Sequence, residues 1–77
     1  MKIFLVDNDD SFAGETDVQN GSTAGEAVQQ RKGQHVDLGD YCIRVNRKSY
    51  SKDQLMMLVL SENDRLTVTP HKIEVAA

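Results

Sequence analysis

The chain has 77 residues, of which 39% are hydrophobic and 27% are charged, and its formal net charge is −3. This length and composition are typical of one small folded domain and argue against wholesale disorder. The negative charge and the low aromatic content of 5% argue against a nucleic-acid-binding protein. No stretch is long and apolar enough to span a membrane, and the N-terminus lacks a signal-peptide pattern, so we expect a cytoplasmic protein.

The first half of the chain predicts two strands and a helix. Residues 3–6 are a continuous apolar run, typical of a strand in the middle of a sheet. The acidic, turn-forming residues 7–11 predict a solvated hairpin loop that Gly14 closes, and residues 15–19 are expected to return as a short second strand. Thr23 and Glu26 have the spacing of a capping box that begins a helix, and Gly33 is placed to end it.

The second half predicts three further strands and a short helical turn. Residues 34–40 form a polar loop, 41–45 a third strand and 49–50 a brief return strand. Ser51 and Gln54 repeat the capping-box spacing before the apolar run 55–60, which we expect to begin as a helical turn and to become extended. Leu66 and Val68 alternate with threonines, which predicts the last strand, and Pro70 begins a tail.

Together these elements predict an α+β domain in which a mixed sheet of four to five strands packs on one main helix. If the first and last strands lie side by side in the centre, the arrangement is the ubiquitin-like β-grasp fold. We therefore expect residues 1–77 to form a single β-grasp domain, with residues 70–77 as its C-terminal tail.

Residues 43–69 carry a resemblance to a known family. The strand that ends in Val45-Asn46, a short connecting segment, the turn Asn63-Asp64 and a last strand follow one another in this order. This order resembles the small ubiquitin-like sulfur carriers of thiamine and molybdopterin synthesis (the ThiS/MoaD family), in which the turn is commonly Gly-Asp. Asparagine also enters left-handed backbone conformations, so Asn63 is a tolerable substitute for that glycine. The resemblance implies a β-grasp fold and an adenylating, E1-like enzyme as a partner.

The end of the chain departs from this family. The chemistry of the family depends on a C-terminal Gly-Gly, whose carboxylate is adenylated and converted to a thiocarboxylate, whereas this chain ends in Val75-Ala76-Ala77. We therefore expect a non-enzymatic, ubiquitin-like protein-binding module. The alternative is a sulfur carrier or modifier that an adenylating enzyme activates at its C-terminal carboxylate. Val75, Ala76 and Ala77 are the candidate residues for modification or docking.

Four basic residues are candidates for a partner-binding face: Arg44, Arg47, Lys48 and Arg65. Residues 41–77 hold six Lys and Arg against four Asp and Glu, whereas residues 1–40 hold three against eight, so the positive charge is concentrated in the second half. The resemblance implies that the sheet face that carries these residues contacts a protein partner.

No catalytic, metal-binding or cofactor-binding pattern is found in the sequence. His35 and His71 have no nucleophile in a recognisable arrangement near them. Residues 7–18 lack calcium-loop chemistry, because Phe12 stands at the position of the required glycine and Val18 at that of the bidentate glutamate. The single cysteine, Cys42, is expected to be a buried thiol. We therefore expect no enzyme, no cofactor and no metal.

Overall fold

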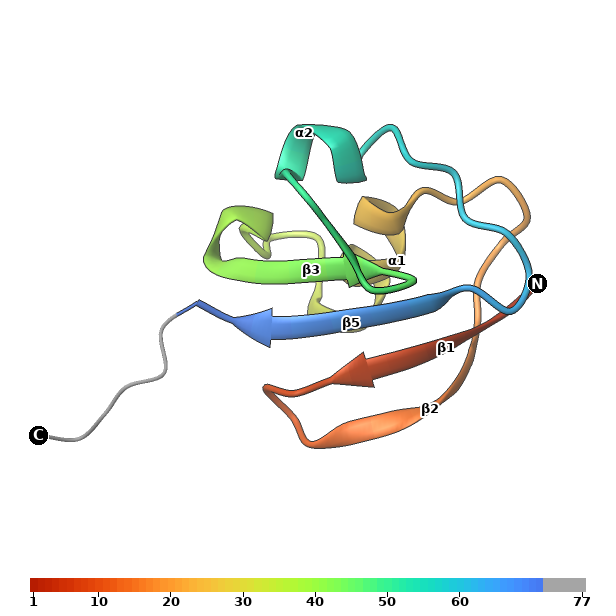
Figure 1. Ribbon diagram of the computed structural model, residues 1–77, viewed down its shortest axis with the longest axis horizontal. Coiled ribbons are helices and arrows are strands. Elements are labelled where there is room, and N and C mark those ends of the chain that lie inside the picture. Colours follow the sequence, from red (N-terminus) through yellow and green to blue (C-terminus); the bar gives the residue numbers. More distant parts are fainter. Residues whose placement is uncertain (72–77) are drawn as a thin grey trace, which may run out of the picture.

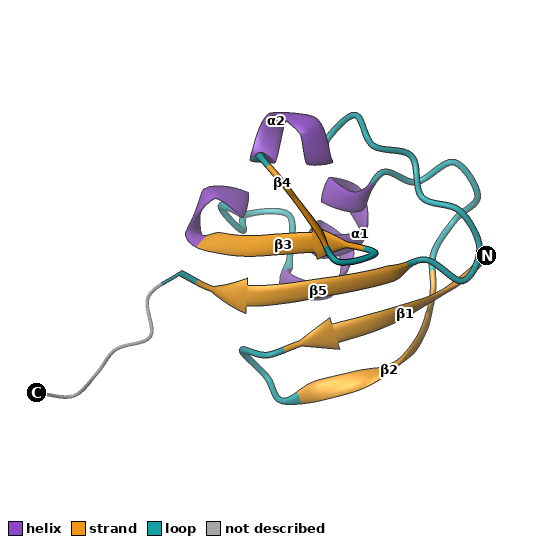
Figure 2. Ribbon diagram, in the orientation of Figure 1, coloured by secondary structure: helices purple, strands orange, loops and turns teal. Residues whose placement is uncertain are grey.

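The computed structural model describes residues 1–71, which form an α+β domain with a five-stranded mixed sheet and one main helix (Figure 1). The strands are β1 (Lys2–Asp7), β2 (Phe12–Asp17), β3 (Tyr41–Val45), β4 (Lys48–Tyr50) and β5 (Arg65–Pro70). The helices are α1 (Ala24–Lys32) and the single turn α2 (Lys52–Leu55), with a 3-10 turn at Leu38–Asp40 (Figure 2). Within residues 1–71, no helix has the length and apolar character that a membrane crossing requires.

The strands follow one another across the sheet in the order β2-β1-β5-β3-β4. β1 and β5 pair in parallel, and the other three pairs are antiparallel. The first and last strands therefore lie side by side in the centre of the sheet, which is the condition that the sequence analysis set for a β-grasp fold, and the central place of β1 agrees with the apolar run at residues 3–6. This topology is compatible with the expected β-grasp arrangement.

The core lies between the sheet and α1. Every second side chain of the central strands points inward and is buried, including Leu5 of β1, Ile43 of β3 and Leu66 of β5. From the helix, Ala24, Ala27 and Val28 complete the core.

Both predicted capping boxes are present. The Thr23 hydroxyl accepts a hydrogen bond from the Glu26 amide at 3.2 Å, and the Glu26 carboxylate accepts one from the Thr23 amide at 2.9 Å. Ser51 and Gln54 form the same reciprocal pair at the start of α2. These bonds satisfy amide groups that a helix N-terminus otherwise leaves without an acceptor.

The apolar run 55–60 behaves as predicted but contributes less to the core than its composition suggests. α2 ends at Leu55, and the chain then becomes extended, with Val59 in an isolated β-bridge to Thr23. Leu55 and Leu60 are buried, whereas Met57 is 82% exposed. Half of this run therefore lies on the surface.

The predicted position of the second strand is wrong. β2 spans Phe12–Asp17 rather than residues 15–19, and Gly14, which we expected in the loop, lies inside the strand opposite Leu5. The shift has a simple cause: β1 extends to Asp7, so the connecting loop is shorter and β2 pairs along its whole length. The segment predicted as a polar loop at residues 34–40 contains a 3-10 turn at Leu38–Asp40, and Leu38 is buried in it.

Candidate protein-binding face

One face of the sheet packs against α1, and the opposite face, here called the outer face, is turned toward the viewer in Figure 1. Its side chains alternate with the buried ones along each strand. They come from β1 (Lys2, Phe4, Val6), from β5 (Arg65, Thr67, Thr69), from β3 (Cys42, Arg44) and, at one margin, from β2 (Ala13, Glu15, Asp17).

Phe4 and Arg65 form the centre of this face. They stand opposite each other in the parallel pairing of β1 and β5. The Arg65 guanidinium lies 5.5 Å from the centroid of the Phe4 ring, within the range of a cation–π contact. Phe4 remains 38% exposed. An aromatic ring and a guanidinium are thus presented together to solvent.

Arg44 continues the positive charge onto β3. It stands opposite Thr67 of β5 on one side and Ser49 of β4 on the other, and it is exposed. Because Thr67 lies two residues after Arg65 on the same strand, Arg44 and Arg65 share one face of the sheet. The sequence analysis named both residues as candidates for one partner-binding face, and the strand register places both side chains on the outer face.

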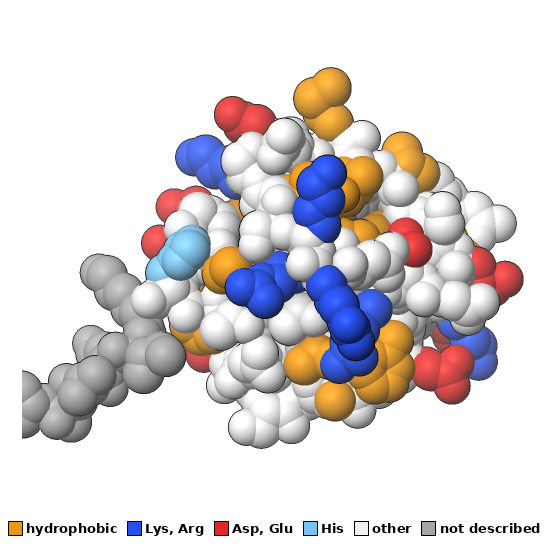
Figure 3. Space-filling model, viewed as in Figure 1, with side chains coloured by type: hydrophobic (Ala, Val, Ile, Leu, Met, Phe, Trp, Pro, Cys, Tyr) orange, Lys and Arg blue, Asp and Glu red, His pale blue; other side chains and the backbone are white. Residues whose placement is uncertain are grey.

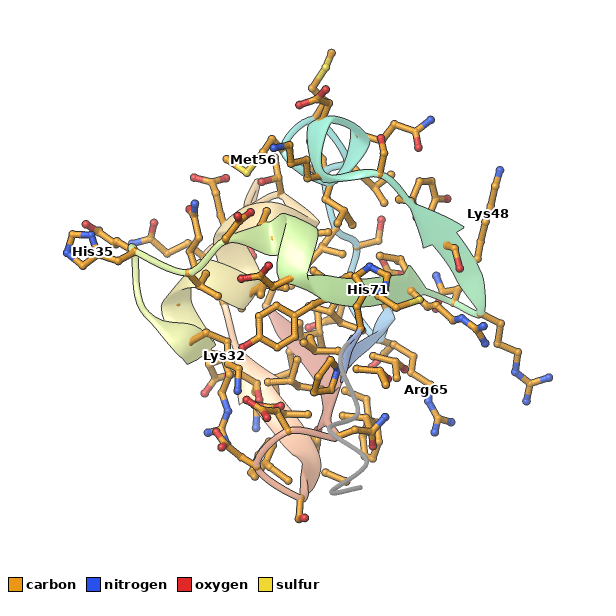
Figure 4. All side chains as sticks on the ribbon, turned by 90° about the vertical axis from the view of Figure 1, so that its left-hand side faces the viewer. Lys32, His35, Lys48, Met56, Arg65 and His71 are labelled. Carbon is orange, nitrogen blue, oxygen red and sulfur yellow. The ribbon has the colours of Figure 1, made fainter. Side chains whose placement is uncertain are left out.

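Arg47 and Lys48 lie beside this pair rather than in line with it. Asn46 and Arg47 form the two-residue turn between β3 and β4, with φ angles of 52° and 72°. Lys48 stands opposite Val45, and its ammonium lies 5.5 Å from the centroid of the Tyr50 ring. Val45 points into the core, and directly opposite residues share a face, so the register does not place Lys48 on the outer face with Arg44. In Figure 4, Lys48 and Arg65 point in different directions.

The positive charge of these four residues is not neutralised within residues 1–71. The ion pairs in this part of the chain use only Arg31 and Lys32 as their cations. In Figure 3, Lys and Arg side chains gather near the middle of the outer face, and most of the visible Asp and Glu side chains lie toward its margins. The centre of the face therefore favours an acidic partner.

A second charged cluster lies at the end of α1, and the sequence interpretation missed it. Asp7, predicted to lie in a solvated loop, is fully buried at the end of β1. One of its carboxylate oxygens lies 3.2 Å from Arg31 Nε and 3.2 Å from Lys32 Nζ. Lys32 also contacts Asp9 at 2.8 Å, and the Arg31 guanidinium lies 4.4 Å from the centroid of the Phe12 ring. The sequence contained a signal for this cluster. The loop after β1 is acidic and the last turn of α1 is basic, so the two segments could have been expected to form ion pairs.

The burial of this cluster affects its titration. Burial by itself raises the pKa of Asp7, but hydrogen bonds from Lys32, Arg31 and the Asp9 amide outweigh it and hold the pKa below its usual value. Burial lowers the pKa of Lys32, whereas its hydrogen bonds with Asp9 and Asp7 raise that pKa well above the usual value. Both groups are therefore charged near neutral pH, and the cluster fixes the loop to the helix.

The other candidates from the sequence lie elsewhere. Cys42 is half-buried on the outer face rather than fully buried, because β3 turns it away from the core. His35 and His71 are far apart (Figure 4), and residues 1–71 contain no group of His, Cys, Asp and Glu that could hold a metal ion.

β5 leads directly to the segment that the family resemblance makes important. Pro70 stands opposite Tyr41, and the His71 amide donates to the Asp40 carbonyl at 3.0 Å. Val75, Ala76 and Ala77 lie outside the described residues. No protein-family model matches the chain, and comparison with curated proteins finds no match.

Proposed function

We propose that the chain is a ubiquitin-like β-grasp module that binds an acidic protein surface through its outer face. The observation that carries this proposal is the Phe4–Arg65 pair, in which an exposed ring and a guanidinium that has no ion pair among residues 1–71 stand together at the centre of an open sheet. Aromatic and arginine side chains are the types most enriched among the energetically dominant residues of protein interfaces. Arg44 extends the same surface.

Two structural relationships support the finer assignment to a β-grasp fold similar to the sulfur carriers. The first is the parallel pairing of β1 and β5 at the centre of the sheet, with the helix on one face. The second is a hydrogen bond of 3.0 Å between Asn46 and Asp64. It joins the strand end and the turn on which the sequence resemblance depends.

A direct test compares single charge reversals of equal size. Arg65→Glu alters the outer face, and Lys52→Glu alters an exposed position on α2 by the same charge. Tagged full-length chains are expressed in the native cell, crosslinked, and analysed by quantitative mass spectrometry. The affinity of a purified candidate partner is then measured by calorimetry.

We expect a partner that binds the wild type and the Lys52→Glu variant but loses about tenfold or more in affinity with Arg65→Glu, equivalent to about 1.4 kcal/mol. Phe4→Ser is expected to weaken the same partner, because it removes the apolar part of the surface. If every captured protein binds Arg65→Glu and wild type equally, the outer face is not the binding surface and the proposal is wrong.

The second candidate function is a carrier or modifier activated at its C-terminal carboxylate by an adenylating enzyme. The family resemblance and the central position of β5, which leads into residues 72–77, favour it. Intact-mass analysis of protein from the native cell tests it. A thiocarboxylate, an adenylate or a conjugate on the Ala77 carboxylate supports the carrier, and an unmodified carboxylate under conditions of active sulfur transfer excludes it.

A further inference from the structure

β2 forms one edge of the sheet, and part of its backbone faces away from the other strands. Met1 and Val18 exchange both of their backbone hydrogen bonds, at 3.0 and 2.9 Å. Along an antiparallel pair, hydrogen-bonded and non-hydrogen-bonded residue pairs alternate, so these bonds determine which residues of β2 bond to β1 and which do not. The amide and carbonyl groups of Ala13, Glu15 and Asp17 therefore point outward. Such a row of backbone groups can pair with an added strand.

The charges along this edge select what can pair with it. Glu15 and Asp17 are both exposed, and they lie on the same face because they are two residues apart. Neither carboxylate belongs to an ion pair in the part of the chain that the structure describes. In an added antiparallel strand, two residues spaced i and i+2 would stand directly opposite these carboxylates. Lysine or arginine at both positions complements them.

The same charges disfavour a second copy of this chain as the occupant. Antiparallel pairing of two β2 edges would bring the Glu15 and Asp17 carboxylates of both copies close together, and like charges opposite each other destabilise a sheet. The other edge of the sheet, β4, has only three residues, against six in β2. β2 is thus the edge long enough to hold an extended segment.

A groove continues from the end of β2 along α1. It has a volume of about 630 Å³, and its lining includes Gln19, Gln29 and Gln34 beside Glu26. The Gln30 side-chain amide donates to the Asp17 carbonyl at 3.0 Å, so this carbonyl already has a partner and the row of open backbone groups ends here. Amide oxygens and carboxylates accept hydrogen bonds, so the groove suits a polar or cationic continuation of the added strand.

We infer that the β2 edge binds an extended segment of a partner protein with lysine or arginine at alternate positions, by antiparallel strand addition. The backbone edge of β2 is separate from the open surface around Arg65, but Glu15 and Asp17 lie at the β2 margin of the outer face, opposite Phe4 and Lys2. This margin selects the opposite charge in its partner. The outward amide and carbonyl groups of Ala13 and Glu15 and the amide of Asp17 bind the backbone of the segment, and the Glu15 and Asp17 carboxylates determine which side chains it carries.

The test uses the full-length protein and short synthetic peptides in an NMR titration. The probe is the blocked peptide Thr-Val-Lys-Val-Lys-Val-Thr. Two further peptides serve as controls. One has glutamate in place of both lysines, and the other carries an N-methyl group on the backbone amide of each lysine. The variant Glu15→Lys/Asp17→Lys reverses the edge charge, and Asp53→Lys/Glu62→Lys makes the same change in net charge at exposed positions elsewhere.

We expect the lysine peptide to shift the amide signals of residues 13, 15 and 17 and to bind about tenfold more tightly than the glutamate peptide. Glu15→Lys/Asp17→Lys should reverse that preference, Asp53→Lys/Glu62→Lys should keep it, and N-methylation should abolish binding. Equal binding of the N-methylated peptide, an unreversed preference or shifts confined to other strands would each overturn the inference. Self-association, seen as concentration-dependent shifts of β2 without peptide, would also overturn it.

Discussion

Asn46 and Asp64 are 18 residues apart in the chain, and their side chains are joined by a hydrogen bond of 3.0 Å. The side-chain oxygen Oδ1 of Asn46 also accepts from the Arg65 backbone amide at 3.0 Å, and the Asn46 backbone amide donates to the Arg65 carbonyl at 2.8 Å. Asp64 in turn accepts from the Ser61 amide at 2.7 Å. Two loops at one end of the sheet are therefore fixed to each other by one asparagine.

The first prediction concerns this asparagine. Asn46→Ala removes both side-chain hydrogen bonds and leaves an alanine at a φ of 52°, so we expect a loss of about 2 kcal/mol in the free energy of unfolding. Asn46→Gly keeps the backbone conformation accessible and should lose about 1 kcal/mol. Urea unfolding measures both. A double-mutant cycle of Asn46→Gly with Asp64→Ala should show coupling of about 0.5 kcal/mol or more, and strict additivity would contradict the proposed link.

The second prediction concerns the other residue of the same turn. Arg47 has a φ of 72°, which is unfavourable for a residue with a side chain, and two-residue hairpin turns of this kind favour Asn-Gly. We expect Arg47→Gly to stabilise the fold by about 1 kcal/mol and to raise the Tm by about 5 °C. Arg44→Gly, in the neighbouring strand, is the matched control and should lower the Tm. A Tm of Arg47→Gly at or below that of the wild type would show that the turn is not strained.

Local sequence signals predict most of this fold. The capping pairs Thr23–Glu26 and Ser51–Gln54 depend only on neighbours three residues away, and both are formed as predicted. The alternation of Leu66 and Val68 likewise predicts β5 correctly. Such signals succeed because the interacting groups are close in the chain.

Long-range pairing is what the sequence could not supply. The burial of Asp7 depends on Arg31 and Lys32, 24 and 25 residues away, and without those partners a run of acidic residues indicates a solvated loop. For the same reason the start of β2 was misplaced, because Gly14 reads as a turn residue until its pairing with Leu5 is known. At the candidate face, Arg44 and Arg65 were identified by charge, but Phe4 was not, since it lies within a run that looks entirely buried.

The third prediction tests the buried cluster. Asp7→Asn leaves two cations without a buried carboxylate partner, so we expect a loss of about 3 kcal/mol at pH 7. Asp9→Asn is the matched control, because Asp9 lies at the surface of the same cluster and its loss should cost less than about 1 kcal/mol. Urea unfolding of both variants measures the difference. Equal losses would mean that burial of Asp7 contributes nothing.

The pH dependence follows from the same residue. The pKa of Asp7 is lower in the folded protein than in the unfolded chain, so its contribution is complete above the unfolded value, about 3.9, and is lost as the pH falls through the lower folded value. The difference in stability between wild type and Asp7→Asn should therefore shrink below about pH 4. The pKa of Lys32 is raised, so its contribution persists up to the unfolded value of about 10.4 and declines only in stronger base. A constant difference from pH 7 to pH 2 would contradict this account.

The last prediction distinguishes whether the Phe4 ring contributes mainly to the stability of the fold or mainly to binding a partner. Leu5 is 1% exposed and its neighbour Phe4 is 38% exposed, because successive residues of β1 face opposite sides of the sheet. Leu5→Ala removes core contacts and should cost about 3 kcal/mol, whereas Phe4→Ala removes a half-covered ring and its contact with Arg65 and should cost about 1 kcal/mol. Thermal unfolding measures both changes, and calorimetry with a partner of the outer face measures the effect of Phe4→Ala on binding. If Phe4→Ala destabilises the fold as much as Leu5→Ala does, the ring belongs to the core. A small loss of stability with a large loss of affinity would mean that the ring serves the partner.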